Sequence, residues 1–194
     1  MTAGLRRPSS TRLLADRLTE ATVAALGTAE VEVIEVRDHA HDLVNHLVSG
    51  YPSETLAPAL DAVTGAAGLI AVTPTISASY GALFKMFFEV LAEDALRDKP
   101  VLMAATGGTA RHALVLEHAV RPLFTYLHAD VVPTSVFAAP EDWGGAASPD
   151  LLGERVSRAA AELAERMKNR GEPAPRDPYA PVPFESLLPR ASTE

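Results

Sequence analysis

Short apolar segments alternate along this chain with longer segments of helical pattern, and this alternation limits the fold more than any other feature. The short segments are 31–36 (VEVIEV), 68–72 (GLIAV), 101–105 (VLMAA) and 131–136, which read as strands. Strands separated by helices need crossover connections, and these produce a parallel sheet covered on both faces. The pattern therefore predicts a three-layer α/β fold.

The segments between these strands predict helices. They carry apolar residues at helical spacing, as in 11–26, where Leu14 and Leu18 are four residues apart. The other expected helices are 43–48, 53–63, 79–91, 111–127 and 151–169, with a loop over 137–149. Residues 171–194 are rich in proline and predict an extended tail. We therefore expect one domain over 1–170, followed by that tail.

Composition excludes several classes of protein. The chain has no cysteine, which rules out disulfides, thiolate metal sites, iron–sulfur clusters and a cysteine nucleophile. Its net charge of −8 and its 6% aromatic content argue against nucleic-acid binding, which needs clustered cations or stacking platforms. Residues 1–20 contain no apolar signal segment and no run approaches 18 apolar residues, so we expect a cytoplasmic protein without membrane spans.

A histidine cluster does not change this picture. His39, His41 and His46 lie near Asp42, and Asp42 shares a helical face with His46. The cluster is far from the strand ends at which such sheets bind ligands, and the segment offers no supporting residues around a metal. No metal is expected.

The loop that opens the first helix, 4–11 (GLRRPSST), has the residues of an anion site. Ser9, Ser10 and Thr11 supply hydroxyls and free N–H groups at a helix start, where the helix dipole favours negative charge. The same residues also make an ordinary N-cap, so this loop alone does not decide between the two.

Two further polar loops follow the strands 68–72 and 101–105. In 73–81 (TPTISASYG), Pro74 bends the chain and Gly81 permits close approach of a flat ligand, although a long connecting loop with a Ser cap fits equally well. In 106–109 (TGGT), paired glycines expose amides toward a ligand or form a plain tight turn.

Considered together, the three loops are more specific than each is alone. They belong to consecutive strands of one sheet, so they should meet at one edge, which suits a phosphate at the first loop and an aromatic ring across the other two. Neither the dinucleotide fingerprint GxGxxG nor the P-loop pattern GxxxxGK[ST] is present. The hydrolase elbow GxSxG is also missing.

Three motifs carry a family resemblance. PSSTRLLADRL, TPTISASYGALFKMFFEVL and ATGGTARHALVLEHAVRPLF resemble the NAD(P)H-dependent FMN reductases of two-component monooxygenase systems. The likeness is greatest to the sulfonate-utilisation reductases and to actinobacterial reductases that partner luciferase-like monooxygenases. The resemblance extends from about Gly4 to Val136, and the tail motif PFESLLP shows a weaker resemblance.

The resemblance implies a fold, cofactors and a site. The fold would be flavodoxin-like, with a parallel five-stranded sheet in the order 2-1-3-4-5, and the cofactors FMN and NAD(P)H. Ser9, Ser10 and Thr11 would hold the FMN phosphate, with help from an arginine at position 6 or 7. The ribityl chain and the ring would contact Pro74, Thr75, Ile76, Ser77, Ser79, Tyr80 and Gly81 on one side and Thr106, Gly107 and Gly108 on the other. Hydride would pass directly from nicotinamide to flavin, so no catalytic residue is named.

The resemblance also implies partners: a flavin-dependent monooxygenase and further copies of the chain in a homodimer or homotetramer. In sulfonate-type reductases, a Tyr or His at the position of His118 is associated with a π-helical bulge at a tetramer interface. Pro122 cannot donate to the His118 carbonyl, so the helix is faulted there, either by a bulge or by a simple kink. Separately, the apolar arc of 83–91 is wider than one sheet face needs, which favours contact with another subunit.

The first strand of the expected fold is nearly missing. Only Met1–Leu5 precede the serine loop, although this strand should be the central one. Either the natural start lies upstream or this segment supplies only a stub; we favour the upstream start. We expect Met1–Leu5 to form at most a residual strand, and this chain to bind FMN less tightly than an N-terminally extended one.

Other functions are compatible with the same fold. One is a quinone or azo-dye reductase that holds FMN permanently, which would purify yellow. Another is an electron-carrying flavodoxin, although PSST fits the phosphate loop of that class poorly. A third is a non-catalytic interaction module, given the short first strand.

Overall fold

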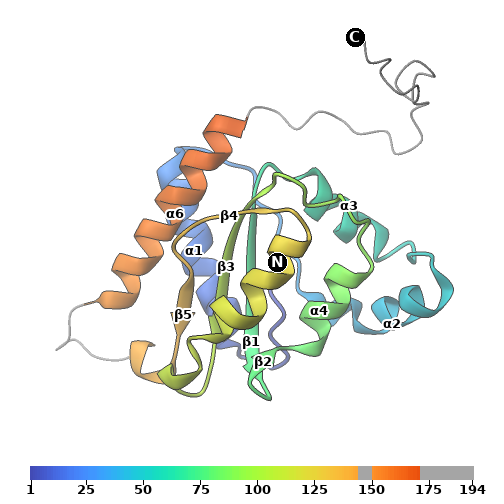
Figure 1. The fold of residues 1–194 in the computed structure, drawn as a ribbon, viewed down its shortest axis with the longest axis horizontal. Coiled ribbons are helices and arrows are strands. Elements are labelled where there is room, and N and C mark those ends of the chain that lie inside the picture. Colours follow the sequence, from blue (N-terminus) through green and yellow to red (C-terminus); the bar gives the residue numbers. More distant parts are fainter. Residues whose placement is uncertain (144–149, 171–194) are drawn as a thin grey trace, which may run out of the picture.

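A mainly parallel sheet forms the centre of the fold, with helices on both faces (Figure 1). The computed structural model describes residues 1–143 and 150–170. The strands are β1 (Leu69–Ile76), β2 (Ser79–Tyr80), β3 (Pro100–Thr106), β4 (Asp130–Val131) and β5 (Val136–Ala138). β3 pairs in parallel with β1, β4 and β5, and all its residues are buried, as expected of a strand covered on both faces.

The amino-terminal residues take the place of the central strand as a short stub. Thr2 makes single parallel bridges to Glu35 on one side and to Val72 on the other. The neighbouring backbone bonds are Thr2 N–H to the Ile34 carbonyl at 2.8 Å and Ala3 N–H to the Val72 carbonyl at 3.0 Å. If the expected strands are numbered along the chain, with Met1–Leu5 as the first and 31–36 as the second, the expected order 2-1-3-4-5 is thus confirmed. The expected residual strand is confirmed as well.

The strand predicted over 31–36 is wrong as stated. Only Glu35 joins the sheet, because the stub beside this segment offers one bridging residue and a strand needs a continuous partner. From Val36 to His39 the chain turns as a short 3-10 helix, η1.

Two groups of helices cover the sheet (Figure 1). One face carries α1 (Ser10–Leu26) and α6 (Leu151–Arg170), and the other carries α2 (Ala40–Ser49), α3 (Ala57–Gly65), α4 (Ala82–Glu89) and α5 (Arg121–Tyr126). The helices predicted at 11–26 and 151–169 match α1 and α6 closely. Of the helices that the structure describes, none is long and apolar enough to cross a membrane.

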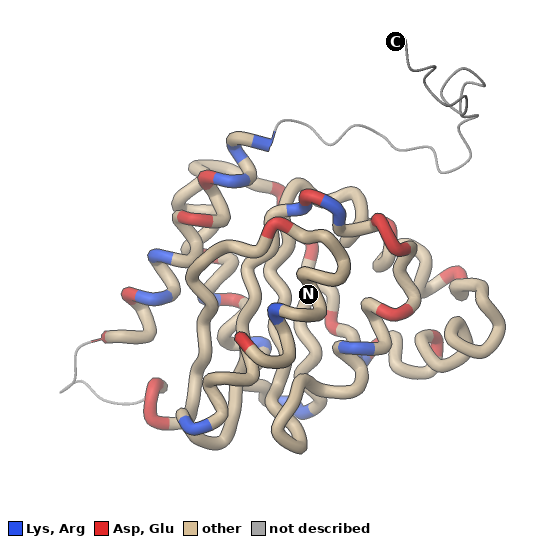
Figure 2. The backbone as a smooth tube through the Cα atoms, viewed as in Figure 1, with Lys and Arg blue, Asp and Glu red and all other residues tan. Residues whose placement is uncertain are grey.

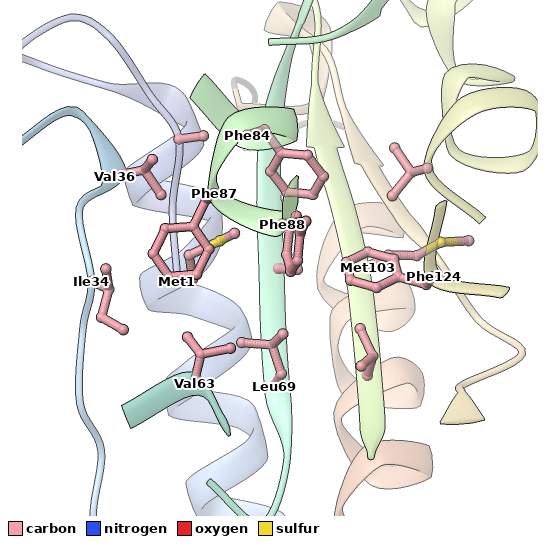
Figure 3. Close-up of a cluster of buried hydrophobic side chains, with 14 of the residues drawn as sticks. Met1, Ile34, Val36, Val63, Leu69, Phe84, Phe87, Phe88, Met103 and Phe124 are labelled. Carbon is pink, nitrogen blue, oxygen red and sulfur yellow. The ribbon is translucent and has the colours of Figure 1, made fainter. Parts of the chain in front are cut away.

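The core under α4 is aromatic. Phe84, Phe87 and Phe88 are buried between α4 and the sheet, and the Phe88 ring packs edge-on against Phe124 with 5.0 Å between centroids. Figure 3 shows these rings beside Met1 and above β1 and β3. Acidic and basic residues are interspersed along the described chain rather than gathered in a stripe (Figure 2).

The loop after β1 differs from the prediction. The strand continues past Thr73-Pro74 to Ile76 and turns back as β2, so the predicted helix 79–91 begins only at Ala82. The turn passes through Ser77 and Ala78, whose φ angles are +50° and +66°. Those values suit a two-residue hairpin turn that normally selects glycine or asparagine. Ser77 and Ala78 therefore do not predict it.

The helix predicted over 111–127 and the strand predicted over 131–136 are both divided. The helical region consists of a 3-10 turn (Ala110–His112), a π-helical turn (Leu116–Val120) and α5. His118 lies in the π-helical turn, just before Pro122, so the bulge and not a simple kink is present. In the strand, Pro133 separates β4 from β5 because proline cannot donate to the ladder.

Candidate active site

The three polar loops meet at the carboxyl edge of the sheet. Thr11 Oγ1 and Thr106 Oγ1 share a buried hydrogen bond of 2.8 Å, which joins the first loop to the third. Pro74 stands opposite Thr106 in the ladder between β1 and β3, which brings the second loop beside the third. The predicted convergence of the loops is therefore confirmed.

The first loop presents the open amino end of α1. Ser9 is the N-cap, and its Oγ accepts the Arg12 N–H at 3.2 Å. In the described part of the chain the N–H groups of Ser10 and Thr11 have no partner, and the first turn of α1 has no acidic residue. Unpaired N–H groups and the helix dipole together favour an anion at this point.

Glycine is required where the stub enters this loop. A Cβ placed on Gly4 would lie 2.1 Å from Ser9 Oγ and 3.2 Å from the Thr11 Cβ. The backbone of Gly4 can therefore approach the helix start more closely than any other residue would allow. The stub and the first turn of α1 are packed as one unit.

Arginine side chains around Glu35 make hydrogen bonds and ion pairs on the outer side of the first loop. Glu35 accepts from Arg12 Nη1 at 2.7 Å and from Arg37, and Arg37 Nη1 donates to the Arg6 carbonyl at 2.9 Å. The exposed Arg7 guanidinium stands 3.6 Å from Asp38 and 3.9 Å from Glu35 at the outer side of this loop. Hydrogen bonds to Asp16 and then to Glu35 keep the pKa of Arg12 above its ordinary value. Sequence reasoning missed Glu35 and Arg37, because nothing in 31–37 shows that this segment folds back under the loop.

The second loop is the hairpin of β1 and β2. Thr73 closes its base, because its Oγ1 accepts the Gly81 N–H at 3.0 Å and donates to the Pro74 carbonyl at 3.0 Å. Gly81 is buried and its N–H is occupied, so the structure does not place it at the open surface. The other predicted residues of this loop are half-buried or exposed: Pro74, Thr75, Ile76, Ser77, Ser79 and Tyr80.

The third loop leaves one open glycine. A Cβ on Gly107 would lie 2.7 Å from Phe137 Cζ, so that glycine permits close packing against β5. A Cβ on Gly108 would meet nothing within 4 Å. Thr106 is buried and serves the link to Thr11. Phe137, which the sequence analysis did not single out, thus packs against Gly107.

Trp143 has a packing role in the structure. Its ring lies 5.1 Å from the Arg17 guanidinium on α1 and borders the core between α1, α6 and the sheet. The preceding Glu141 accepts the Ala110 N–H at 3.2 Å, which ties this turn to the loop after β3.

The residues present fit an FMN molecule. The unpaired amides of Ser10 and Thr11 suit its phosphate, and the open space at Gly108 suits the edge of a flat ring. Thr75 Oγ1 is buried and has no hydrogen-bond partner among the described residues, which suits a polar atom of a ligand.

The bond between the first and third loops can be tested without any ligand. We expect Thr11→Val to lower the free energy of unfolding by about 1–3 kcal/mol, because the buried Thr106 hydroxyl then lacks a partner. Urea denaturation measures this loss. The double variant Thr11→Val/Thr106→Val removes both hydroxyls and should recover much of it; a double variant less stable than the sum of the single changes would contradict the assignment.

Comparison with known proteins identifies the family. The sequence profile of the NADPH-dependent FMN reductases matches residues 1–144. The chain is 36% identical to an FMN reductase (NADPH) of Pseudomonas aeruginosa, over 89% of this chain and 92% of that one. It is 37% identical to the NADH-dependent FMN reductase SfnE of Pseudomonas putida, over 90% and 88%. An oxidoreductase structure from Corynebacterium diphtheriae superposes with a TM-score of 0.83 at 44% identity, covering 87% of this chain and 94% of that one. The chain therefore belongs to the NADPH-dependent FMN reductase family and is an oxidoreductase that uses NAD(P)H and FMN.

Proposed function

We propose that the enzyme takes up free FMN, reduces it with NADPH or NADH, and releases the reduced flavin to a flavin-dependent monooxygenase in the cytoplasm. The openness of the site carries this proposal. Ser10, Ser77 and Gly108, one from each loop, are exposed in the structure, so a flavin can enter and leave from solvent. The motif resemblance to reductases of two-component systems supports the monooxygenase as recipient.

We assign the residue roles as the sequence analysis did, apart from Gly81 and Thr106, which are buried. Ser9, Ser10 and Thr11 hold the phosphate through the open end of α1. The ribityl chain and one ring edge contact the hairpin residues Pro74, Thr75, Ile76, Ser77, Ser79 and Tyr80. Gly107 and Gly108 lie against the other edge. Bound FMN supplies the acceptor for a hydride from nicotinamide. The protein contributes position and exclusion of water, and none of its side chains needs to move a proton for that transfer.

We also propose that the enzyme works as a homodimer or homotetramer. Two exposed apolar side chains, Leu114 (63%) and Tyr126 (71%), flank the π-helical turn. Leu83, Met86, Val90 and Leu91 of the α4 region are only partly covered by the chain's own core. Sedimentation of the purified protein tests this proposal, and a monomer at micromolar concentration would disprove it.

An oxidation assay separates the proposed activity from its rivals. NAD(P)H consumption is measured with and without added FMN, FAD and riboflavin. We expect little consumption without flavin and turnover that saturates with FMN. A protein that purifies yellow and reduces a quinone without added FMN would instead be a quinone reductase with resident flavin. Absence of NAD(P)H consumption in every case would disprove the enzymatic proposal. Failure to support a cognate monooxygenase in a coupled assay would disprove the proposed partnership.

A further inference from the structure

The segment that follows the third loop is exposed at the edge of the candidate active site. β3 is buried along its whole length, but residues 110–114 are all exposed. The first three of them, Ala110–His112, form a 3-10 turn that begins two residues after Gly108. Figure 1 shows this part of the chain at the lower end of the sheet, together with the β1–β2 hairpin and the turn that follows β5. A ligand whose ring lies against Gly108 therefore has this segment beside it.

The backbone of the 3-10 turn is held in place by two side chains. Thr109 is its N-cap, and Thr109 Oγ1 accepts the Arg111 N–H at 3.4 Å. Glu141 Oε1 accepts the Ala110 N–H at 3.2 Å. Gly108 and Arg111 are three residues apart in the sequence, so their Cα atoms are separated by at most about 11 Å. The structure thus fixes the point from which the Arg111 side chain starts.

The guanidinium of Arg111 has no hydrogen bond or ion pair within the part of the chain that the structure describes. The arginines around the first loop differ, because Arg7, Arg12 and Arg37 all pair with carboxylates. Arg6 is likewise unpaired in the described residues, but it lies on the loop assigned to the FMN phosphate. An unpaired guanidinium offers five N–H donors in a planar fork, which matches the oxygens of a phosphate.

The second substrate brings phosphate to this region. NADH and NADPH both carry a pyrophosphate, which one ribose separates from the nicotinamide, and NADPH has a further phosphate on its adenosine ribose. Hydride transfer requires the nicotinamide to lie against the flavin ring, which we assign to Gly107 and Gly108. The pyrophosphate then lies one ribose away from these glycines, a span comparable with that from Gly108 to Arg111.

The other two loops are poor places for this pyrophosphate. The open amino end of α1 is assigned to the phosphate of FMN. The hairpin loop 73–81 contains no charged residue, so it offers no counter-charge. In a chain with a net charge of −8, the unpaired cation beside the third loop is therefore the group best suited to the dinucleotide.

We propose that Arg111 binds a phosphate group of NAD(P)H while the nicotinamide lies over the flavin. The inference rests on the proposed function, since it uses the assignment of the flavin ring to the third loop. It adds a residue for the second substrate, because every residue assigned so far binds FMN. Arg111 supplies affinity and orientation and takes no part in the hydride transfer itself. The phosphate is the pyrophosphate, which both dinucleotides share, or the 2′-phosphate, which only NADPH carries.

The substitution Arg111→Gln tests the proposal and separates these two phosphates. With saturating FMN, we expect the KM for NADPH to rise about 10- to 100-fold, while kcat and the KM for FMN stay within about twofold. An equal rise in the KM for NADH would assign Arg111 to the pyrophosphate, and a rise confined to NADPH would assign it to the 2′-phosphate. The affinity of the oxidised, FMN-saturated protein for NADP⁺, measured by titration calorimetry without turnover, should fall by the same factor.

Three comparisons make the result specific to charge at this position. Arg111→Lys keeps the charge but loses the planar fork, so it should recover part of the affinity. The KM of the wild-type protein for NADPH should rise with added NaCl more steeply than that of Arg111→Gln, because salt screens an exposed ion pair. Arg158→Gln is the matched control. Arg158 is exposed on α6 and is also unpaired among the described residues, and its substitution should change no KM.

Two results would overturn the inference. One is a KM for both dinucleotides that stays within about twofold in Arg111→Gln. The other is a rise in the KM for FMN alone, since Arg111 would then belong to the flavin site. Either result leaves the reductase activity of the wild-type protein intact, so the proposed function would stand. Absence of NAD(P)H oxidation by the wild-type protein would instead disprove the proposed function, and the titration with NADP⁺ would still decide whether Arg111 binds a phosphate.

Discussion

Ser10→Glu is expected to raise the KM for FMN about 100-fold while leaving the KM for riboflavin within about twofold. Ser10 is exposed in the first turn of α1, beside the amides assigned to the phosphate. A carboxylate there would stand within a few ångströms of the phosphate. At that separation two like charges near a protein surface repel by about 3 kcal/mol, which corresponds to roughly 100-fold in affinity. Riboflavin has no phosphate and escapes the repulsion.

The same substitution should not harm the protein itself. A negative charge at a helix amino end is favourable by about 0.3–1 kcal/mol, so Tm should stay level or rise slightly. Ser157→Glu, at an exposed position in the middle of α6, adds the same charge away from the site and should change neither KM. NAD(P)H oxidation with each flavin gives the comparison. If Ser10→Glu weakened FMN and riboflavin equally, the phosphate would have to lie elsewhere.

The elements that were predicted well are those whose signal lies within a few neighbouring residues. The continuous apolar segment 101–105 predicted a buried strand, and β3 is buried along its whole length. The meeting of Thr11 with Thr106 followed from strand order, since consecutive parallel strands place their carboxyl ends at one edge. The fold and the meeting of the three loops at one edge of the sheet could therefore be derived before any coordinates.

The features that escaped prediction depend on contacts between distant residues. The β2 hairpin is an example, because Ser77 and Ala78 adopt positive φ angles that their sequence does not favour. The segment 31–36 has the composition of a strand and still lacks ladder partners, because its neighbour is the stub at Thr2. Glu35 meets Arg12 across 23 positions of sequence, and no local pattern indicates that pair.

Gly108→Val is expected to weaken the binding of both FMN and riboflavin by about 10- to 100-fold without lowering Tm. A Cβ at this position meets nothing in the protein within 4 Å, and the backbone has no positive φ angle that would strain a side chain. The chain can therefore accept valine. A flavin ring edge packed against this glycine could not accept valine there. Extra methyl groups in a filled contact weaken the free energy of binding by about 1–3 kcal/mol. Flavin fluorescence titration measures the affinities.

Two other glycines make the result specific. Gly65, at the end of α3, is equally open, so Gly65→Val adds the same side chain away from the site and should leave flavin affinity unchanged. Gly107→Ala places a Cβ 2.7 Å from Phe137 Cζ. It should instead lower Tm, because Phe137 must shift to make room for the added methyl group. Since we expect Ser10→Glu to discriminate between FMN and riboflavin and Gly108→Val not to, the two variants together test whether phosphate and ring lie at separate loops. Unchanged affinity for both flavins in Gly108→Val would mean that the ring does not lie against the loop after β3.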